Sequence, residues 1–248
     1  MTETIGERFM RETSYDTEDM APSDQQKGVP QPPLQAPWDP AHPRLALPAP
    51  GAISVPSMDL RAAIEGRRSV RSYSDTPITL EELAWLLWAT QGVKRVEPGR
   101  TYRNVPSGGA RHPFETHLIV RNVANLEPGI WRYTALEHQL VALDLARPGL
   151  MDEAVRACAG QQFVAECAAL FAWACVPYRV TWRYAERGYR DMHIDAGHVC
   201  QNLYLAAQPI GCGVCALLAF GDQAMCDLLG LERSEQWVIY MAAVGKVA

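Results

Sequence analysis

The segment from Pro106 to Glu115 holds the residues best suited to chemistry. It reads Pro-Ser-Gly-Gly-Ala-Arg-His-Pro-Phe-Glu, so two adjacent glycines follow a serine and a proline stands on each side. Because proline cannot donate a backbone hydrogen bond, such a segment is excluded from a helix interior or a central strand. Gly108 and Gly109 have no side chains, so the backbone there can come close to something flat or charged.

The polar side chains of this segment suit a bound ligand. Ser107 and His112 can hydrogen-bond to it, and Arg111 can neutralise a negative charge. The apolar run 118–120 follows directly and predicts a buried strand. A polar, glycine-rich loop that leads into a core strand is typical of a ligand-binding loop, although a tight turn would show the same pattern.

A second cluster, of three arginines, lies earlier in the chain. Arg67, Arg68 and Arg71 fall within five residues, beside Ser69. Three guanidinium groups and a hydroxyl suit a phosphate, because arginine donates hydrogen bonds in a planar fork. A solvated basic patch is the alternative interpretation. The position of the cluster, in a break between two predicted helices, favours the ligand.

Three other patterns resemble chemical motifs, but their context in the sequence argues against that chemistry. The run 211–216 matches G-x-G-x-x-A, but it follows a predicted helix and opens a strand, which is the reverse of a dinucleotide site. Asp195 and His198 are spaced like metal ligands, yet no second motif completes a site, so no metal is predicted. Cys212 and Cys215 lack the second pair that zinc needs, and a redox dithiol stays an alternative.

Composition limits the classes of protein that remain. The chain has 248 residues, 48% of them hydrophobic, so one large domain or two small ones with a real core are expected. The net charge is −5 without a clustered basic face, which excludes a nucleic-acid surface. A polar start, no long apolar run and seven cysteines in mostly apolar surroundings predict a cytoplasmic protein with free thiols and no membrane span.

The chain divides into two unequal parts. Residues 1–56 hold 10 of the 18 prolines and predict an extended arm without regular elements. The arm contains Leu34, Trp38 and Leu45, so we expect it to lie as a strap on the body or on a partner subunit; a flexible tail is the alternative. A single folded domain is expected over 57–248.

Mixed helices and strands without internal repeats predict an α+β domain with one central sheet. The helix signals include a Thr79–Glu82 capping box and the apolar stripe of the longest helix. Helices are expected over 60–66, from 80 onward, and over 151–158, 191–208 and 222–229. Strands are expected over 114–123, 130–133, 140–143, 168–176 and 237–244, with an apolar, compact segment over 213–220.

Taken together, these segments resemble the FMN-dependent nitroreductase-like proteins, and specifically their SagB-type dehydrogenase branch. The resemblance covers about residues 57–248, and the order of the motifs is its specific part. The matching motifs are Arg67-Arg68-Ser69-Val70-Arg71-Ser72-Tyr73, the loop 101–113, the segments 182–190 and 195–203, Gly211-x-Gly213, and the closing Val244-Gly245-Lys246.

The resemblance implies a nitroreductase-like fold, with a mixed or antiparallel sheet flanked by helices, and a homodimer that holds FMN between its subunits. The first arginines and Ser69 would hold the phosphate and ribityl chain, with Lys246 adding charge there. Gly108 and Gly109 would lie along the flavin ring and come from the partner chain. Gly211 and Gly213 would approach the edge of the same ring. The cofactor-binding positions that match are Arg67, Arg68, Ser69, Arg71, Pro106, Ser107, Gly108, Gly109, His112, Gly211, Gly213 and Lys246.

One departure from the branch concerns the catalytic pair, Arg183 and Tyr184. Members that dehydrogenate peptide azolines carry Lys-Tyr there, and azoline oxidation needs a base to remove a proton. Arginine stays protonated and cannot be that base. Arg183 would instead place positive charge beside the flavin or an anionic substrate, or form a salt bridge with Glu186.

The function expected from these observations is that of an FMN-dependent oxidoreductase. NADH or NADPH would supply electrons, and a small acceptor such as a nitro compound or quinone would receive them. The alternatives are a dehydrogenase that acts on a modified peptide, a flavin-binding protein without turnover, and a thiol redox module that uses Cys212 and Cys215.

Overall fold

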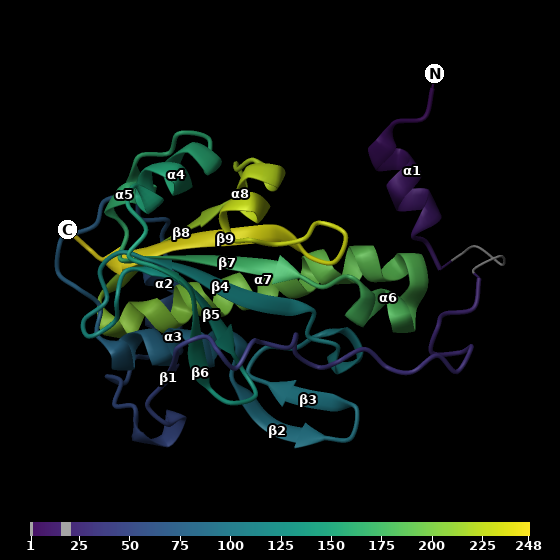
Figure 1. Cartoon of the computed structure of the whole chain (residues 1–248), viewed down its shortest axis with the longest axis horizontal. Helices are drawn as coiled ribbons and strands as arrows, with labels where there is room; N and C mark the ends of the chain where they lie inside the picture. The colour runs from purple at the N-terminus through teal and green to yellow at the C-terminus, as the bar shows by residue number, and fades with distance from the viewer. Residues whose placement is uncertain (1, 16–20) are drawn as a thin grey trace.

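A seven-stranded antiparallel sheet forms the centre of the computed structural model, which describes residues 2–15 and 21–248 (Figure 1). The strand order is β1-β6-β5-β4-β7-β9-β8, and every neighbouring pair is antiparallel. This confirms the predicted α+β class. The strands are β1 (Arg44–Ala46), β4 (Phe114–Val120), β5 (Gly129–Thr134), β6 (Gln139–Leu145), β7 (Ala169–Cys175), β8 (Cys212–Leu217) and β9 (Trp237–Lys246).

The central strands β4, β5 and β7 are buried along their whole length. Successive side chains of a strand point to opposite faces, so both faces of the sheet must be covered. Leu118 packs into the core on one face and its neighbour Ile119 into the core on the other. The apolar runs that predicted these strands therefore reflect burial on two sides rather than on one.

Two layers of helices supply this cover (Figure 1). On one face lie α3 (Leu80–Gln91) and α7 (Gly188–Ala207), with α6 (Tyr178–Tyr184) next to the start of α7. On the other face lie α4 (Leu150–Ala157), α5 (Phe163–Glu166) and α8 (Asp222–Leu228). Each layer closes one of two separate hydrophobic cores.

The predicted capping box of α3 is present, since Thr79 and Glu82 each accept the backbone N–H of the other. Helix α7 begins at Gly188, three residues before the predicted start. A Cβ atom at Gly188 would lie 3.0 Å from the backbone nitrogen of Thr181 in α6, so this first turn is a close contact between two backbones. The apolar stripe that predicted α7 begins only after this contact.

The proline-rich arm contains regular elements, contrary to expectation. Strand β1 pairs with β6 at the edge of the sheet, a position where flanking prolines are tolerated. Helix α1 (Ile5–Glu12) begins with a Thr4 capping box, and a short 3₁₀ turn spans Pro50–Ala52. Met1 and residues 16–20 of the arm lie outside the described residues.

Hydrogen bonds hold the arm on the body, as the strap interpretation predicted. The Ala36 N–H donates to Glu115 over 2.7 Å, and Arg179 donates to the Pro33 carbonyl over 3.0 Å. Glu115, Arg132 and Arg179 form a buried ion cluster beneath this stretch. The boundary between arm and domain at residue 57 stays a prediction.

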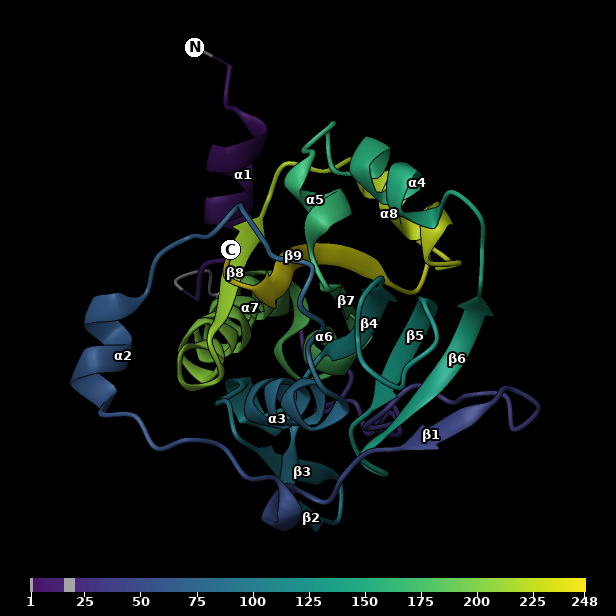
Figure 2. The same ribbon diagram turned by 90° about the vertical axis from the view of Figure 1, so that its left-hand side faces the viewer.

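The sequence patterns did not predict a small β-hairpin. Strands β2 (Val93–Glu97) and β3 (Arg100–Arg103) form a separate two-stranded sheet after α3. Helix α2 (Leu60–Gly66) has the predicted bounds but stands beside the body, with Ala63 its one buried residue (Figure 2). Among the described helices, none is long and apolar enough to cross a membrane.

Candidate active site

The Gly108–Gly109 loop, which joins β3 to β4, lies against the predicted catalytic pair. Gly109 has φ 58°, a conformation that favours glycine. A Cβ atom there would collide with the Tyr184 hydroxyl and would lie 3.0 Å from Nε of Arg183. The structure therefore brings Arg183, Tyr184 and the glycine pair together within one chain.

Arg183 is exposed, and its guanidinium lies 5.4 Å from the centre of the Tyr184 ring. The alternative salt bridge to Glu186 is not formed, and Arg183 has no ion pair within the part of the chain that the structure describes. A charge that no carboxylate neutralises is free to act on a ligand.

Asp195 of α7 anchors the same loop, and the sequence did not predict this role. The Ser107 hydroxyl donates to Oδ2 of Asp195 over 2.5 Å, and the Gly108 N–H donates to Oδ1 over 3.3 Å. Asp195 is 5% exposed, and this burial raises the pKa of its carboxyl. A carboxylate within the apolar stripe of α7 was the sequence signal that could have indicated this role of Asp195.

His112 and Arg111 turn into the protein rather than toward the surface of the loop. His112 is 4% exposed, and burial lowers the pKa of its imidazole to about 3. Arg111 donates to the carbonyls of Gly109 and Gly99. The Arg111 guanidinium thus donates within the chain and the His112 imidazole is buried, and a cofactor role for His112 stays a prediction. Pro106 is exposed at the start of the loop.

The arginine segment runs beside the edge strand β8. The Val70 N–H donates to the Val214 carbonyl over 2.9 Å. The guanidinium of Arg67 lies 5.4 Å from the centre of the Tyr204 ring, and Oγ of Ser69 lies 3.0 Å from the Tyr204 hydroxyl. Tyr204, a second residue that the sequence did not suggest, therefore gathers Arg67 and Ser69 at one place.

The other two arginines of the segment do not converge on this tyrosine. Arg71 lies over the ring of Phe163 at 5.9 Å, and Arg68 is exposed. Within residues 2–15 and 21–248, neither of them forms an ion pair with a carboxylate, and the same holds for Arg67. Three positive charges therefore stand close in sequence without neutralisation.

The remaining predicted positions are used within the chain to different degrees. Gly211 is exposed at φ 64°, and no atom lies within 4 Å of its missing Cβ. A Cβ at Gly213 would lie 2.6 Å from the Cβ of Val70, so packing alone explains that glycine. Lys246 pairs with Glu82 at 2.5 Å, which neutralises the charge that we expected at a phosphate.

The glycine loop and the arginine segment lie on opposite sides of α7. Tyr204 follows Asp195 by nine residues. This corresponds to two and a half helical turns and an axial distance of roughly 13 Å. One chain therefore holds the two predicted halves of the site apart.

The cysteine pair of β8 cannot be a redox dithiol. Cys212 and Cys215 are three residues apart on one strand, so their side chains point to opposite faces and their Cα atoms lie roughly 10 Å apart. A disulfide requires less than about 7 Å. Burial also raises the pKa of both thiols, that of Cys212 to about 12. The thiol redox alternative is therefore wrong.

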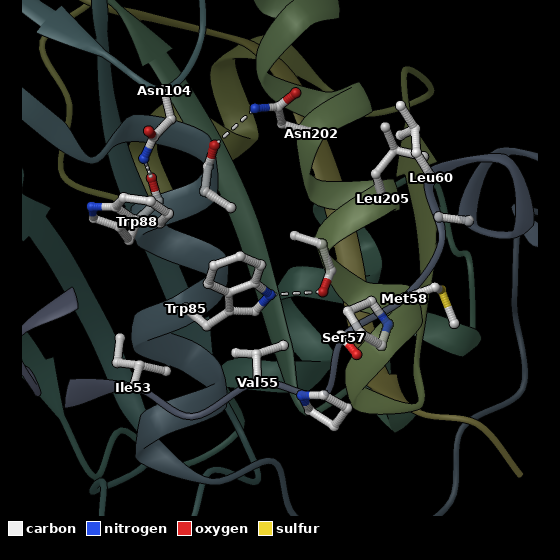
Figure 3. A pocket seen from close by; sticks show the side chains of 15 residues that line it. Ile53, Val55, Ser57, Met58, Leu60, Trp85, Trp88, Asn104, Asn202 and Leu205 are labelled. Carbon is white, nitrogen blue, oxygen red and sulfur yellow. Dashed lines mark hydrogen bonds between the residues drawn. The ribbon is translucent and has the colours of Figure 1, made fainter. Parts of the chain in front are cut away.

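An apolar groove of about 680 Å³ lies between α3, α7 and the end of the arm (Figure 3). The indoles of Trp85 and Trp88 stack at 5.7 Å on one wall. The side-chain amides of Asn104 and Asn202 donate to carbonyls at the end of α3. The groove is thus rigid on its α3–α7 side. Its other lining residues include Ile53, Val55, Met58, Leu60, Leu205 and Pro209.

Comparison with known sequences places most of the chain in one family. The model of the "Nitroreductase family" matches residues 64–246. The nitroreductase-like protein MJ1384 of Methanocaldococcus jannaschii is 35% identical over 167 residues, which are 67% of this chain and 82% of that protein. The trifolitoxin-processing protein TfxB of Rhizobium leguminosarum is 37% identical over 111 residues, 43% of this chain and 30% of TfxB.

Solved structures show the same fold. A nitroreductase-like protein of Anabaena variabilis has a TM-score of 0.74 at 24% identity; the match covers 98% of this chain and 47% of that one, so this chain spans about half its length. A nitroreductase-like protein of Desulfovibrio desulfuricans, solved in complex with FMN, has a TM-score of 0.55 at 18% identity over 77% of this chain and 88% of the other. At these identities the likeness concerns the fold alone.

Proposed function

Since this chain belongs to the nitroreductase family of oxidoreductases, we propose that it uses FMN to pass electrons from NADH or NADPH to a small acceptor. The observation that carries the proposal is the set of unneutralised arginines beside Ser69 and Tyr204. Support for the choice of cofactor comes from the Desulfovibrio protein, which was solved with FMN.

The residues present fit a flavin phosphate. Arg67 and Ser69 meet at Tyr204, whose hydroxyl accepts the Ala216 N–H over 2.9 Å and can donate to Ser69. Arg67 and Arg68 have no competing carboxylate within the described chain, and free guanidinium groups bind phosphate strongly. We assign the phosphate to Arg67, Arg68 and Ser69. Lys246 fits less well, because Glu82 already neutralises it.

The glycine loop fits the flat part of the cofactor. Gly108 and Gly109 are partly buried, and the missing side chain of Gly109 makes room for Tyr184 and Arg183, which border the loop. Bound FMN would supply the redox chemistry, and the protein would supply position and charge. An acceptor that takes up hydride gains negative charge and needs a proton. We assign the charge stabilisation to Arg183 and the proton donation to the Tyr184 hydroxyl.

We further propose that the site is completed in a homodimer. The two halves lie on opposite sides of α7, so a loop from a second copy can approach the arginine segment where its own loop cannot. Gly197 stands exposed in the middle of α7 with no atom near its missing Cβ, although glycine there costs about 1 kcal/mol relative to alanine. The close approach of a second helix would account for it.

Exposed apolar side chains on α2 and α7 offer a further contact surface for a second copy. Ile194 of α7 is 54% exposed, and Leu60 and Ile64 of α2 are 65% and 55% exposed. Leu60 also lines the groove of Figure 3, and we expect a second copy to cover the groove and these side chains. Light scattering should give twice the monomer mass of 27.5 kDa, and a flavin-loaded monomer at micromolar concentration would contradict the dimer.

The function is tested by flavin content and turnover together. The purified protein should show flavin absorbance, lose it with NADH or NADPH, and regain it with a nitro compound or quinone. A Tyr184→Phe variant should keep its flavin and bleach normally, but recolour more slowly because the proton donor is missing. Bound flavin without bleaching by either donor would indicate a flavin-binding protein without turnover.

A second candidate is a dehydrogenase that acts on a modified peptide. The relative TfxB, which processes trifolitoxin, favours it. Arg183 speaks against it, since arginine cannot be the base that removes the proton. An Arg183→Lys variant separates the two: a gain of thiazoline oxidation would favour the dehydrogenase, and unchanged acceptor reduction with no such gain would favour the reductase.

A further inference from the structure

We propose that Asp195 is the positioning residue of the active site: through Ser107 it fixes the Gly108–Gly109 backbone and places a buried negative charge behind it. The inference rests on the proposed flavin site and adds a residue to it. Asp195 itself lies beneath the loop, 5% exposed, so it acts on a ligand through the backbone that it holds and through its charge rather than by contact.

A short chain of hydrogen bonds carries the argument. The His112 N–H donates to Oγ of Ser107 over 2.8 Å, and the Ser107 hydroxyl donates to Oδ2 of Asp195 over 2.5 Å. The second oxygen, Oδ1, accepts the Gly108 N–H over 3.3 Å. One carboxylate thus ties both ends of the loop to a rigid helix, although 87 residues separate Gly108 from Asp195.

These bonds also bear on the ionisation state. Burial raises the pKa of the Asp195 carboxyl, whereas the donors that meet its two oxygens lower that pKa and so favour the charged form on which the proposal rests. The Ser107 hydroxyl uses its proton on Asp195 and one acceptor site on His112, so its main role is to hold the loop. An asparagine at position 195 keeps the shape but loses the charge, and its amide nitrogen would meet one of the two donors.

The charge has a consequence for any flavin on the loop. Adding electrons to a flavin increases its negative charge, and a fixed carboxylate close to it opposes that addition. Asp195 should therefore hold the flavin potential below the value that it would have beside a neutral residue. Removal of the charge should shift the potential in the positive direction.

The first test needs no cofactor. Hydrogen–deuterium exchange in the flavin-free protein should show protected amides at Gly108 and His112. In Asp195→Ala, the peptide over 105–113 should exchange about tenfold faster or more, because each lost charge-assisted hydrogen bond corresponds to about that factor. Ser107→Ala should show the same change, and Ser107→Thr, which keeps the hydroxyl, should restore protection.

Asp191→Asn is the matched control. Asp191 lies one turn earlier on α7, and its Cβ is 3.9 Å from the position of a Cβ at Gly108. It pairs with Arg187 at 3.4 Å and makes no hydrogen bond to the described loop. This variant removes a nearby charge without touching the anchor, so its loop exchange should equal that of the unmodified protein.

The second test uses the flavin-loaded protein. Asp195→Asn should bind FMN about tenfold more weakly and shift its potential in the positive direction, while Asp191→Asn changes both less. If the unmodified protein holds FMN but the Asp195 variants match Asp191→Asn in exchange, affinity and potential, the role of Asp195 is overturned. If the unmodified protein takes up no FMN while the exchange result holds, the flavin assignment fails, and with it the effect on potential, but not the anchor.

Discussion

At the scale of single residues, the arginines that begin the segment 67–71 have no carboxylate partner within the described residues. Arg67 and Arg68 stand without carboxylates within the described residues, whereas Arg61 of α2 pairs with Glu65 at 2.7 Å. Arginines without a carboxylate partner are free to bind an anionic ligand.

We therefore expect Arg67→Ala and Arg68→Ala each to weaken FMN binding by about tenfold or more, since one charge-assisted hydrogen bond contributes roughly 1.5–3 kcal/mol. The ratio of flavin to protein after purification measures this. Arg61→Ala is the control, because it removes an exposed pair of little energetic weight. Equal flavin retention in all three variants would argue against the phosphate assignment.

Gly109 gives a second test at this scale. Alanine there would strain the backbone at φ 58° and collide with the Tyr184 hydroxyl. Gly230→Ala is matched to it, since Gly230 has φ 67° and open space around its missing Cβ. Gly230→Ala should lose about 1–2 kcal/mol of unfolding free energy, and Gly109→Ala should lose more because of the collision. Only Gly109→Ala should also lose flavin, and flavin loss in both would mean that the contact with Tyr184 is irrelevant.

At the scale of elements, one contact positions the arginine segment. Val70 packs on Gly213 of β8, and a Cβ there would lie 2.6 Å from the Cβ of Val70. Gly213→Ala should therefore displace the segment and cost roughly 1–3 kcal/mol by overpacking. Val70→Ala in the same protein should restore part of that loss, because it makes room. Denaturant unfolding of the unmodified protein, the two single variants and the double variant measures the coupling between Gly213 and Val70. Strictly additive losses of unfolding free energy would contradict this coupling.

Local signals in the sequence predicted the elements whose own residues carry a capping motif or an apolar run. The capping box set the start of α3, and the apolar run 168–176 predicted β7, which spans Ala169–Cys175. Strand β1 was missed because it forms by pairing with β6, nearly a hundred residues later in the chain. Propensity cannot report a partner at that distance.

The candidate site shows the same division. Clustered arginines and paired glycines are visible in the sequence, because residue type and spacing are local. The bond from Ser107 to Asp195 joins residues 88 apart, and that from Lys246 to Glu82 joins residues 164 apart. The folded chain decides which polar groups pair with each other. The anchoring of the loop by Asp195 and the neutralisation of Lys246 by Glu82 could therefore only come from the structure.

At the scale of the whole molecule, two neutral histidines are built into the interior. Burial lowers the pKa of His112 to about 3 and that of His117 to about 4. In the unfolded chain both titrate near 6.5, so between that pH and the folded values the unfolded state binds more protons. Stability is therefore fully present above pH 6.5 and falls as the pH drops toward 4.

The expected slope is at most about 1.4 kcal/mol per pH unit for each histidine. A His117→Gln variant should show a shallower loss of unfolding free energy between pH 6.5 and pH 5 than the unmodified protein. Replacement of the exposed His193 by glutamine should leave the slope unchanged. If the slope is the same in all three proteins, buried histidines do not control acid stability.

One anaerobic titration tests whether this chain is a flavin oxidoreductase. The purified protein is mixed with one equivalent of FMN, then with NADH or NADPH, and finally with a nitro compound or a quinone, while the flavin absorbance is recorded. The bound flavin should bleach with at least one donor and recover its absorbance with at least one acceptor. A protein that leaves FMN free in solution, or that holds it without any change on addition of either donor, would not be such an oxidoreductase.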